Sequence, residues 1–119
     1  MPLVEARVPA YKHSGLLHRA LQSLRDQTHS DWVAVVFDDS SEQEGRQVVH
    51  AFNDDRIEYQ PNNKNLGRAA NIDHAFQTNP CLGGEYAFVL EDDNYLFPEF
   101  IAENLREIER QRLNIILRN

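Results

Sequence analysis

Residues 85–95 read Glu-Tyr-Ala-Phe-Val-Leu-Glu-Asp-Asp-Asn-Tyr, an apolar run that ends on three acids and an amide. The run from Tyr86 to Leu90 predicts a buried strand, and Pro98 soon opens a helical pattern. A buried strand with carboxylates at its C-terminal end is typical of ligand sites in α/β sheets. Asp92 and Asp93 are hard oxygen ligands, which suit Mg²⁺ or Mn²⁺ better than Zn²⁺. Taken alone, the stretch is also compatible with a solvated acidic turn.

Two further strands are predicted upstream of this stretch. Residues from Leu3 to Val8 alternate, Leu3 aside: Val4, Ala6 and Val8 share one face and Glu5 and Arg7 the other, which predicts a strand with one polar face. Residues from Trp32 to Phe37 are apolar without a break, as expected of a strand covered on both faces. This second strand also stops on acids, Asp38 and Asp39.

Helical spacing of apolar residues predicts helices between and after these strands. The first is expected to start at a Ser14 cap and to bury Leu17, Ala20, Leu21 and Leu24, and the second to start at a Ser41–Glu44 capping box and to bury Val48, Val49 and Phe52. A third is predicted from Gly67 to Thr78 with Ala69, Ile72 and Phe76 inward, ended by Asn79-Pro80, and a fourth is marked by Phe97, Ile101, Leu105 and Ile108. Brief strands are predicted at Arg56–Gln60 and, as a fifth strand, at Leu113–Leu117.

This alternation predicts an α/β fold, a Rossmann-like and mostly parallel sheet flanked by helices. The carboxyl ends of parallel strands share one edge, so Pro9–Tyr11, Asp38–Asp39 and Asp92–Asp93 should lie together. If the first strand is central, with the second and fourth on either side, a crevice opens between strands one and four. Two acidic pairs at this edge favour a binding site over a solvated turn.

Composition narrows the class of protein. The 119 residues fit one domain, residues 1–119, and the net charge of −7 argues against nucleic acid or an anionic membrane as partner. No apolar run reaches the ~20 residues of a membrane span, and the N-terminus lacks a secretory pattern. Cys81 is the single cysteine, which excludes an internal disulfide. We expect a cytoplasmic protein and leave peripheral membrane attachment open.

Four motifs resemble the N-terminal half of a family 2 glycosyltransferase with the GT-A nucleotide-sugar-binding fold. They are Val8-Pro-Ala-Tyr11, Phe37-Asp-Asp-Ser-Ser41, Asn65-Leu-Gly-Arg-Ala-Ala-Asn71 and Leu90-Glu-Asp-Asp-Asn94. The resemblance runs from about Val4 to Arg112, and each motif alone is weak. It implies a metal-dependent, hexosyltransferase-type enzyme that moves a sugar from a nucleotide sugar, most naturally UDP-linked, to an acceptor hydroxyl.

The resemblance also implies roles for single residues. Asp39 would accept a hydrogen bond from the imide N–H of uracil. Tyr11 would stack on the base, unless it is a core ring capping the first strand, and Pro9 and Ala10 would line the base pocket. Arg68 would meet phosphate or base unless it is a solvated surface arginine.

Other positions in these motifs carry different expectations. Gly67 suits a turn where backbone approaches the ligand. Asp38 is expected to be a helix-dipole or strand-end partner, and Asn71 to make a local hydrogen bond. Glu91 would assist or remain a surface charge. None of the five histidines forms a convincing ligand set, and we expect all of them at the surface.

The acidic motif resembles the family's Asp-x-Asp signature. By that resemblance Asp93 would coordinate Mg²⁺ or Mn²⁺, and Asp92 would hold the ribose or a second metal site. The metal would bridge the diphosphate and act as Lewis acid during transfer.

Two features depart from the family. Glu5 and Arg7 point to one face two residues apart and could pair, but burying that pair in a central strand is costly, so that face is more open than usual or the strand order differs. The acceptor-binding half, with the general base, normally lies beyond the point where this chain stops, so no catalytic base is assigned. A truncated sheet should expose apolar surface near Ile115–Leu117 and favour homo-oligomers.

Three other functions compete with the transferase. A non-catalytic nucleotide-binding or assembly module would keep the pocket and transfer nothing. A sugar nucleotidyltransferase would need a glycine-rich basic loop after the first strand, where residues 8–15 hold one Gly and one Lys. A NAD-binding domain is weaker still, because no Gly-x-Gly-x-x-Gly follows a strand.

Overall fold

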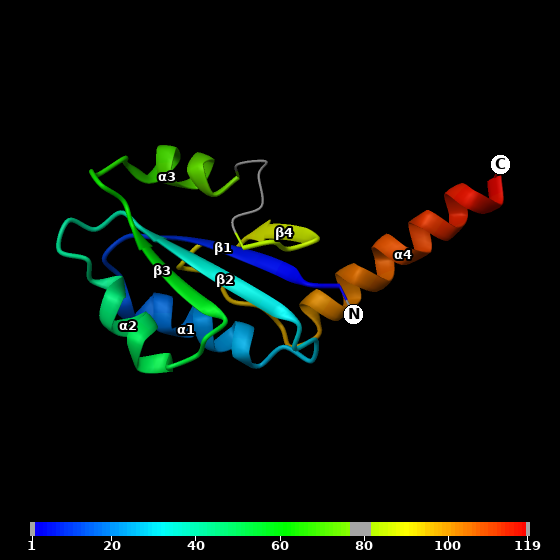
Figure 1. Cartoon of the computed structure of the whole chain (residues 1–119), viewed down its shortest axis with the longest axis horizontal. Coiled ribbons are helices and arrows are strands. Elements are labelled where there is room, and N and C mark those ends of the chain that lie inside the picture. The colour runs from blue at the N-terminus through cyan, green and yellow to red at the C-terminus, as the bar shows by residue number, and fades with distance from the viewer. Residues whose placement is uncertain (1, 77–81, 119) are drawn as a thin grey trace.

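A computed structural model describes residues 2–76 and 82–118 and shows a four-stranded sheet with helices on both faces (Figure 1). In chain order the elements are β1 (Val4–Ala10), α1 (Ser14–Arg25), β2 (Trp32–Asp38), α2 (Gly45–Phe52), β3 (Ile57–Pro61), α3 (Arg68–Ala75), β4 (Tyr86–Val89) and α4 (Phe100–Arg118). The strand order is β3-β2-β1-β4 and every pairing is parallel. The predicted fold class is therefore confirmed, with β1 central between β2 and β4.

The strand register brings the predicted site segments to one edge. Ala10 at the end of β1 pairs with Asp38 at the end of β2, and Arg7 pairs with Val89 at the end of β4. Strands β2 and β3 are added on one side of β1 and β4 is added on the other, and such a switch point is where α/β sheets bind ligands.

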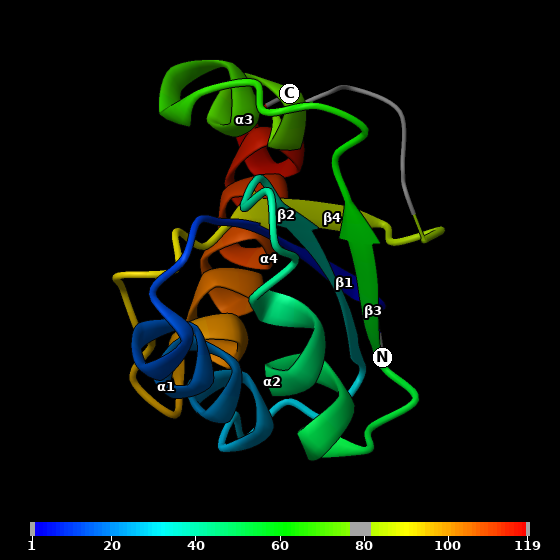
Figure 2. The same cartoon turned by 90° about the vertical axis from the view of Figure 1, so that its left-hand side faces the viewer.

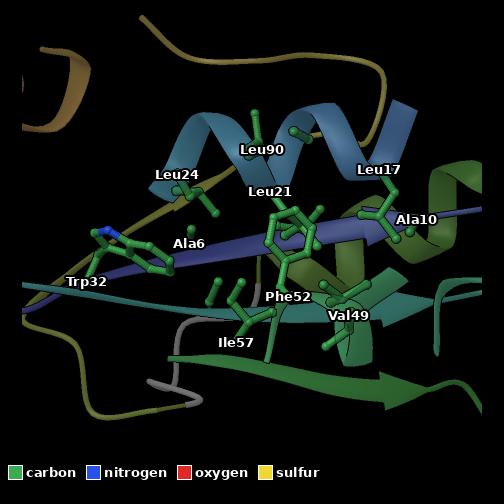
Figure 3. Packing of buried hydrophobic residues seen from close by; sticks show 14 of the residues in the cluster. Ala6, Ala10, Leu17, Leu21, Leu24, Trp32, Val49, Phe52, Ile57 and Leu90 are labelled. Atoms are coloured by element: carbon green, nitrogen blue, oxygen red, sulfur yellow. The ribbon is translucent and has the colours of Figure 1, made fainter. Parts of the chain in front are cut away.

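The main core lies between one face of the sheet and helices α1 and α2 (Figure 3). The four apolar residues of α1 that were predicted to face inward are buried in the same cluster as Ala6 of β1 and Phe52 of α2; they are Leu17, Ala20, Leu21 and Leu24. Ile101 joins this core from the first turn of α4. Leu105 in the next turn also packs against this core, and the later part of α4 extends past the sheet, which gives the molecule extents of 54 × 27 × 21 Å (Figure 1).

The opposite face of the sheet is covered by α3 (Figure 2). Its apolar cluster is small, formed by Val35, Phe37 and Ala75 with Leu82 and Val89 packed against it. Polar side chains complete this face, because Glu5, Arg7 and Asn71 are also buried.

The polar face of β1 is closed, which corrects both expectations for Glu5 and Arg7. All seven residues of β1 are buried, and the strand order is the usual one. The two side chains form an ion pair, with 2.8 Å between Arg7 Nε and Glu5 Oε2. Alternation alone could not indicate this, since it assigns polar side chains to solvent.

Several predicted element boundaries were wrong. Within the described residues neither predicted cap forms, because His13 precedes α1, and Glu44 precedes α2 without a side-chain cap bond. In α3, Ala69 and Phe76 are exposed, Ile72 is partly buried, and Asn71 and Ala75 face inward. Polar anchoring of this short helix replaced the apolar face that its spacing predicted.

The predicted fifth strand at Leu113–Leu117 belongs to α4 instead. A short apolar run cannot be assigned to strand or helix by periodicity, and here it continues a helix that began at Phe100. The apolar sheet surface expected near Ile115 is therefore absent from the described sheet. The expected helix end at Thr78 and Asn79-Pro80, together with Cys81, lies outside the described residues. No helix in the described part of the chain combines the length and apolar character needed to cross a bilayer.

Candidate functional site

A hollow lies at the switch point, between the carboxyl ends of β1, β2 and β4 and the start of α3. It is lined by Pro9, Ala10, Tyr11, His13, Asp39, Arg68, Asn71, Ile72, Glu91 and Asp92. Its volume is about 100 Å³, well below the roughly 300–1,000 Å³ of complete small-molecule sites. The fold thus gathers all the predicted site residues except Gly67 and Asp93 around one hollow, and these two adjoin it.

Tyr11 and Asp92 join the two strands that flank the hollow. The Tyr11 backbone N–H donates to Asp92 Oδ2 at 3.0 Å. Tyr11 is 41% exposed, so it is not the core ring that the sequence left open, and an exposed aromatic residue at this place can offer its ring for stacking. Burial raises the pKa of Asp92, the Tyr11 N–H opposes the rise, and the neighbouring Asp93 charge adds to it.

Asp39 is buried at the bottom of the hollow and organises the loop before α3. Its Oδ1 accepts from Leu66 N at 2.7 Å and from Asn62 Nδ2 at 2.9 Å, and its Oδ2 accepts from Gly67 N at 3.0 Å. A carboxylate oxygen can accept two hydrogen bonds, so these contacts leave one acceptor direction on Oδ2. Asp39 can therefore hold its loop and still accept from a ligand with a single donor.

Asp38 bonds to neighbouring elements and does not line the hollow, as expected of a strand-end partner. It accepts from Gly45 N at the start of α2 (2.8 Å), from Tyr59 Oη (2.6 Å), and from the backbone and hydroxyl of Ser40. Gly45 is required there, because a Cβ would lie 2.9 Å from Asp38 Oδ2. Burial and the bond to Asp38 together raise the pKa of Tyr59 far above its usual value. Asp38 is a structural strand-end residue that stabilises the N-terminus of α2.

Gly67 and Arg68 form the start of α3 beside the hollow. Gly67 has φ +85° and ψ 160°, a conformation almost restricted to glycine, whereas a Cβ there would meet no described atom within 4 Å. Glycine at this position is therefore required by the backbone conformation, and the close approach of Gly67 to a ligand stays a prediction. Arg68 Nη2 lies 3.2 Å from Glu91 Oε1 and 3.8 Å from Asp93 Oδ2, which links α3 to the acidic loop.

The acidic loop supplies the carboxylates that could hold a cation. Within the described residues no three His, Cys, Asp or Glu side chains are grouped as a ready-made metal site. Mg²⁺ is commonly held by one or two carboxylates plus phosphate oxygens and water. The adjacent Asp92 and half-exposed Asp93 fit that arrangement, with Arg68 beside them.

Some residues of the site were missed or misjudged from the sequence. His13 lines the hollow, and its position two residues after Tyr11 was a usable signal. Asn62 donates to both Asp39 and Asn71 (2.9 Å each), which only the folded loop reveals. Asn71 was expected to make a local hydrogen bond, but its Nδ2 donates at 3.1 Å to the carbonyl of Phe37, 34 residues away in β2. His29 was expected at the surface but is buried, with Nε2 3.0 Å from Pro2 O.

Comparison with known proteins gives a family and several relatives. The family described as Glycosyl transferase family 2 matches residues 7–118. A protein of Escherichia coli K12, provisionally described as the colanic acid biosynthesis glycosyl transferase WcaA, is 32% identical over 103 residues, which are 85% of this chain and 36% of that protein. The GalNAc(5)-diNAcBac-PP-undecaprenol beta-1,3-glucosyltransferase of Campylobacter jejuni is 31% identical over 81% of this chain and 31% of its own length. The chain thus spans about a third of the length of these curated relatives.

Solved structures share the fold. TarS of S. aureus superimposes with a TM-score of 0.76 at 22% identity, over 94% of this chain and 20% of the TarS chain. TarS residues 1–349 in complex with UDP-GlcNAc match with a TM-score of 0.76 at 21% identity, over 92% of this chain and 32% of that one. The mannosyltransferase PcManGT of Pyrobaculum calidifontis, in complex with GDP-Man and Mn²⁺, matches with 0.62 at 20% identity, over 79% and 28%. At these identities the likeness shows the fold, and it confirms the predicted GT-A class.

Proposed function

This chain belongs to glycosyl transferase family 2, and from that premise we propose that residues 1–119 are the nucleotide-sugar-binding domain of a glycosyltransferase. The observation that carries the proposal is the hollow at the β1–β4 switch point, where Tyr11, Asp39, Arg68 and Asp92 meet. Ligands of open α/β sheets bind at such points. The nucleotide lies there, with Pro9 and Ala10 along the base.

Uracil is the base that fits Asp39. Its imide edge offers one N–H between two carbonyls, and Asp39 has one acceptor direction left after holding Asn62, Leu66 and Gly67. Guanine presents two adjacent donors to a carboxylate and would displace one of these bonds. The exposed Tyr11 ring supplies a stacking face. Thymine has the same imide edge, and we take uracil of the two because a solved structure with this fold, TarS residues 1–349, is in complex with UDP-GlcNAc.

A divalent cation, Mg²⁺ or Mn²⁺, is held by Asp93 and Asp92 together with the diphosphate. When bound, the metal supplies Lewis-acid stabilisation of the departing nucleoside diphosphate. Asp93 is the direct ligand, and Asp92, fixed by the Tyr11 N–H, holds the ribose or a second position. Arg68 turns from Glu91 and Asp93 to the added phosphate charge.

Sugar transfer to an acceptor hydroxyl needs a general base, and we assign none in this chain. The relatives named above differ in the saccharides they are described with, so the hexosyl group and the acceptor stay open. A module that binds the nucleotide without transferring the sugar is the second candidate. It is favoured by the hollow of about 100 Å³, which covers only part of a nucleotide sugar.

Thermal unfolding with UDP tests the proposal. The midpoint is measured with UDP plus Mn²⁺, with UDP plus excess chelator, and for Asp93→Ala. A ligand at ~100 times its Kd adds roughly 2.7 kcal/mol to the folded state, which is several degrees for a domain of this size. We expect UDP to raise the unfolding midpoint of wild type when Mn²⁺ is present. We expect no rise when chelator is present, and none in Asp93→Ala.

The matched control is Asp55→Ala, an exposed acid at the opposite edge of the sheet, which should keep the full response. An unchanged wild-type midpoint with UDP, GDP and dTDP, each with Mn²⁺, would contradict a nucleotide site in this domain.

A further inference from the structure

The Glu5–Arg7 ion pair of β1 is buried in the core, and the proposed function does not use it. Glu5 is 0% and Arg7 is 5% exposed, and Arg7 Nε lies 2.8 Å from Glu5 Oε2. Desolvating two charges is costly unless their remaining donors and acceptors are also satisfied. The further partners of the pair therefore indicate what it does.

Arg7 reaches the end of α3. Its Nη1 donates to the backbone carbonyl of Ala75 at 3.1 Å. The last carbonyls of a helix lack intrahelical donors, and this end of the helix favours a positive charge. Arg7 thereby fastens the C-terminus of α3 to the central strand.

Glu5 reaches the segment that enters β4. Its Oε1 accepts from Leu82 N at 2.7 Å and from Gly84 N at 3.4 Å. Gly84 packs so closely that a Cβ there would lie 2.7 Å from Glu5 Cβ. One carboxylate thus sets where the chain begins β4.

The two fastened elements carry the site at their other ends. Helix α3 begins at Arg68, and β4 leads into Asp92 and Asp93. Few apolar contacts hold α3 in place, since its face of the sheet has only the cluster of Val35, Phe37 and Ala75 with two partly buried neighbours among the described residues. Among the described residues, the polar anchors therefore contribute much of what positions α3.

We propose that Glu5 and Arg7 are positioning residues of the nucleotide site, which act through α3 and β4 to hold Arg68 and the acidic loop across the hollow. The inference rests on the proposed function, because it concerns the same nucleotide. Neither side chain lines the hollow, so any effect on binding is transmitted by the two elements.

The test compares stability with UDP affinity in three variants. Arg7→Met leaves Glu5 charged and buried, and should lower the unfolding midpoint sharply. The double variant Glu5→Leu/Arg7→Met removes both charges and should recover most of the midpoint, as apolar replacements of buried pairs often do. It cannot restore the bonds to Ala75 O or Leu82 N, so its Kd for UDP with Mn²⁺ should weaken by about 3- to 30-fold. Arg7→Lys keeps a charge beside Glu5 but loses the guanidinium fork, and should bind with intermediate affinity.

Val49→Ala is the control, because it opens a cavity in the core between the sheet and α2, on the face opposite α3. Val49→Ala should lower the unfolding midpoint. Its Kd for UDP, measured at a temperature where every variant is folded, should equal that of wild type. Wild-type affinity in the double variant would overturn the inference and leave the proposed function standing. Failure of wild type itself to bind UDP would overturn the proposed function, and the inference with it.

Discussion

Of the five glycines, Gly84 has the least room for a side chain. A Cβ at this position would lie 2.7 Å from Glu5 Cβ and 3.1 Å from both Glu5 N and Tyr86 O. Backbone neighbours cannot rotate away as a long side chain can, so β1 or the start of β4 would have to shift. Glycine here lets the edge of the sheet close over the buried carboxylate.

Gly84→Ala should therefore destabilise the domain by about 1–3 kcal/mol, the usual cost of overpacking. The control is Gly15→Ala in α1, where a Cβ would meet no described atom within 4 Å and alanine favours the helix. Urea unfolding measures both. If the two variants have the same midpoint as wild type, the packing of Gly84 on Glu5 is not as described.

Single residues were predictable where a local pattern determines their place. Asp39, Tyr11 and Asp92 end predicted strands, and parallel strands bring their ends together, so their gathering followed from the sequence. Glu5 and Arg7 were misjudged because their partners are distant along the chain. Arg7 and Ala75 are separated by 68 residues, and Glu5 and Leu82 by 77. No periodicity carries such information.

At the scale of elements, Gln27 connects the end of α1 with the start of α4. Its Nε2 donates to Ser23 O at 3.0 Å and to Phe97 O at 2.7 Å, and its Oε1 accepts from Ile101 N at 3.0 Å. The last contact satisfies one of the N–H groups that every helix leaves free in its first turn. The side chain is buried, so water cannot replace these bonds.

We expect Gln27→Ala to destabilise the domain by at least about 1–3 kcal/mol, because it leaves buried backbone groups unsatisfied. Gln22→Ala is the control, since Gln22 bonds Asp26 at the surface and should change stability by less than about 0.5 kcal/mol. Hydrogen exchange should also show faster opening of the first turn of α4 in Gln27→Ala alone. Equal exchange in the two variants would exclude Gln27 as the anchor of α4.

Elements were predicted well where their apolar spacing matched the face they bury. The helical spacing from Leu17 to Leu24 correctly predicted α1. The unbroken apolar run from Trp32 correctly predicted a strand covered on both faces, β2. Helix α3 was assigned the wrong inward face because Asn71, and not Phe76, is anchored to the sheet, through the carbonyl of Phe37. A polar side chain that bonds a strand carbonyl gives no apolar signal.

The whole molecule is more extended than a compact domain. Its radius of gyration is 15.2 Å, against about 13.5 Å for a compact chain of this length. Much of the difference comes from α4, which continues beyond its contacts with the sheet (Figure 1). The hollow lies at the far end of the sheet from this helix, so the two features can be tested separately.

The central claim is that a metal-bound nucleoside diphosphate binds where β1, β4 and α3 meet. Paramagnetic broadening tests it most directly, by recording amide signals of ¹⁵N-labelled protein as Mn²⁺ and UDP are added together. We predict selective loss of the signals of Tyr11, Gly67, Asp92 and Asp93, while those of Asp54 to Ile57 at the opposite edge persist. Mg²⁺ in place of Mn²⁺ should shift the same signals without broadening them. Broadening centred anywhere other than this edge, or none at saturating UDP, would contradict the account.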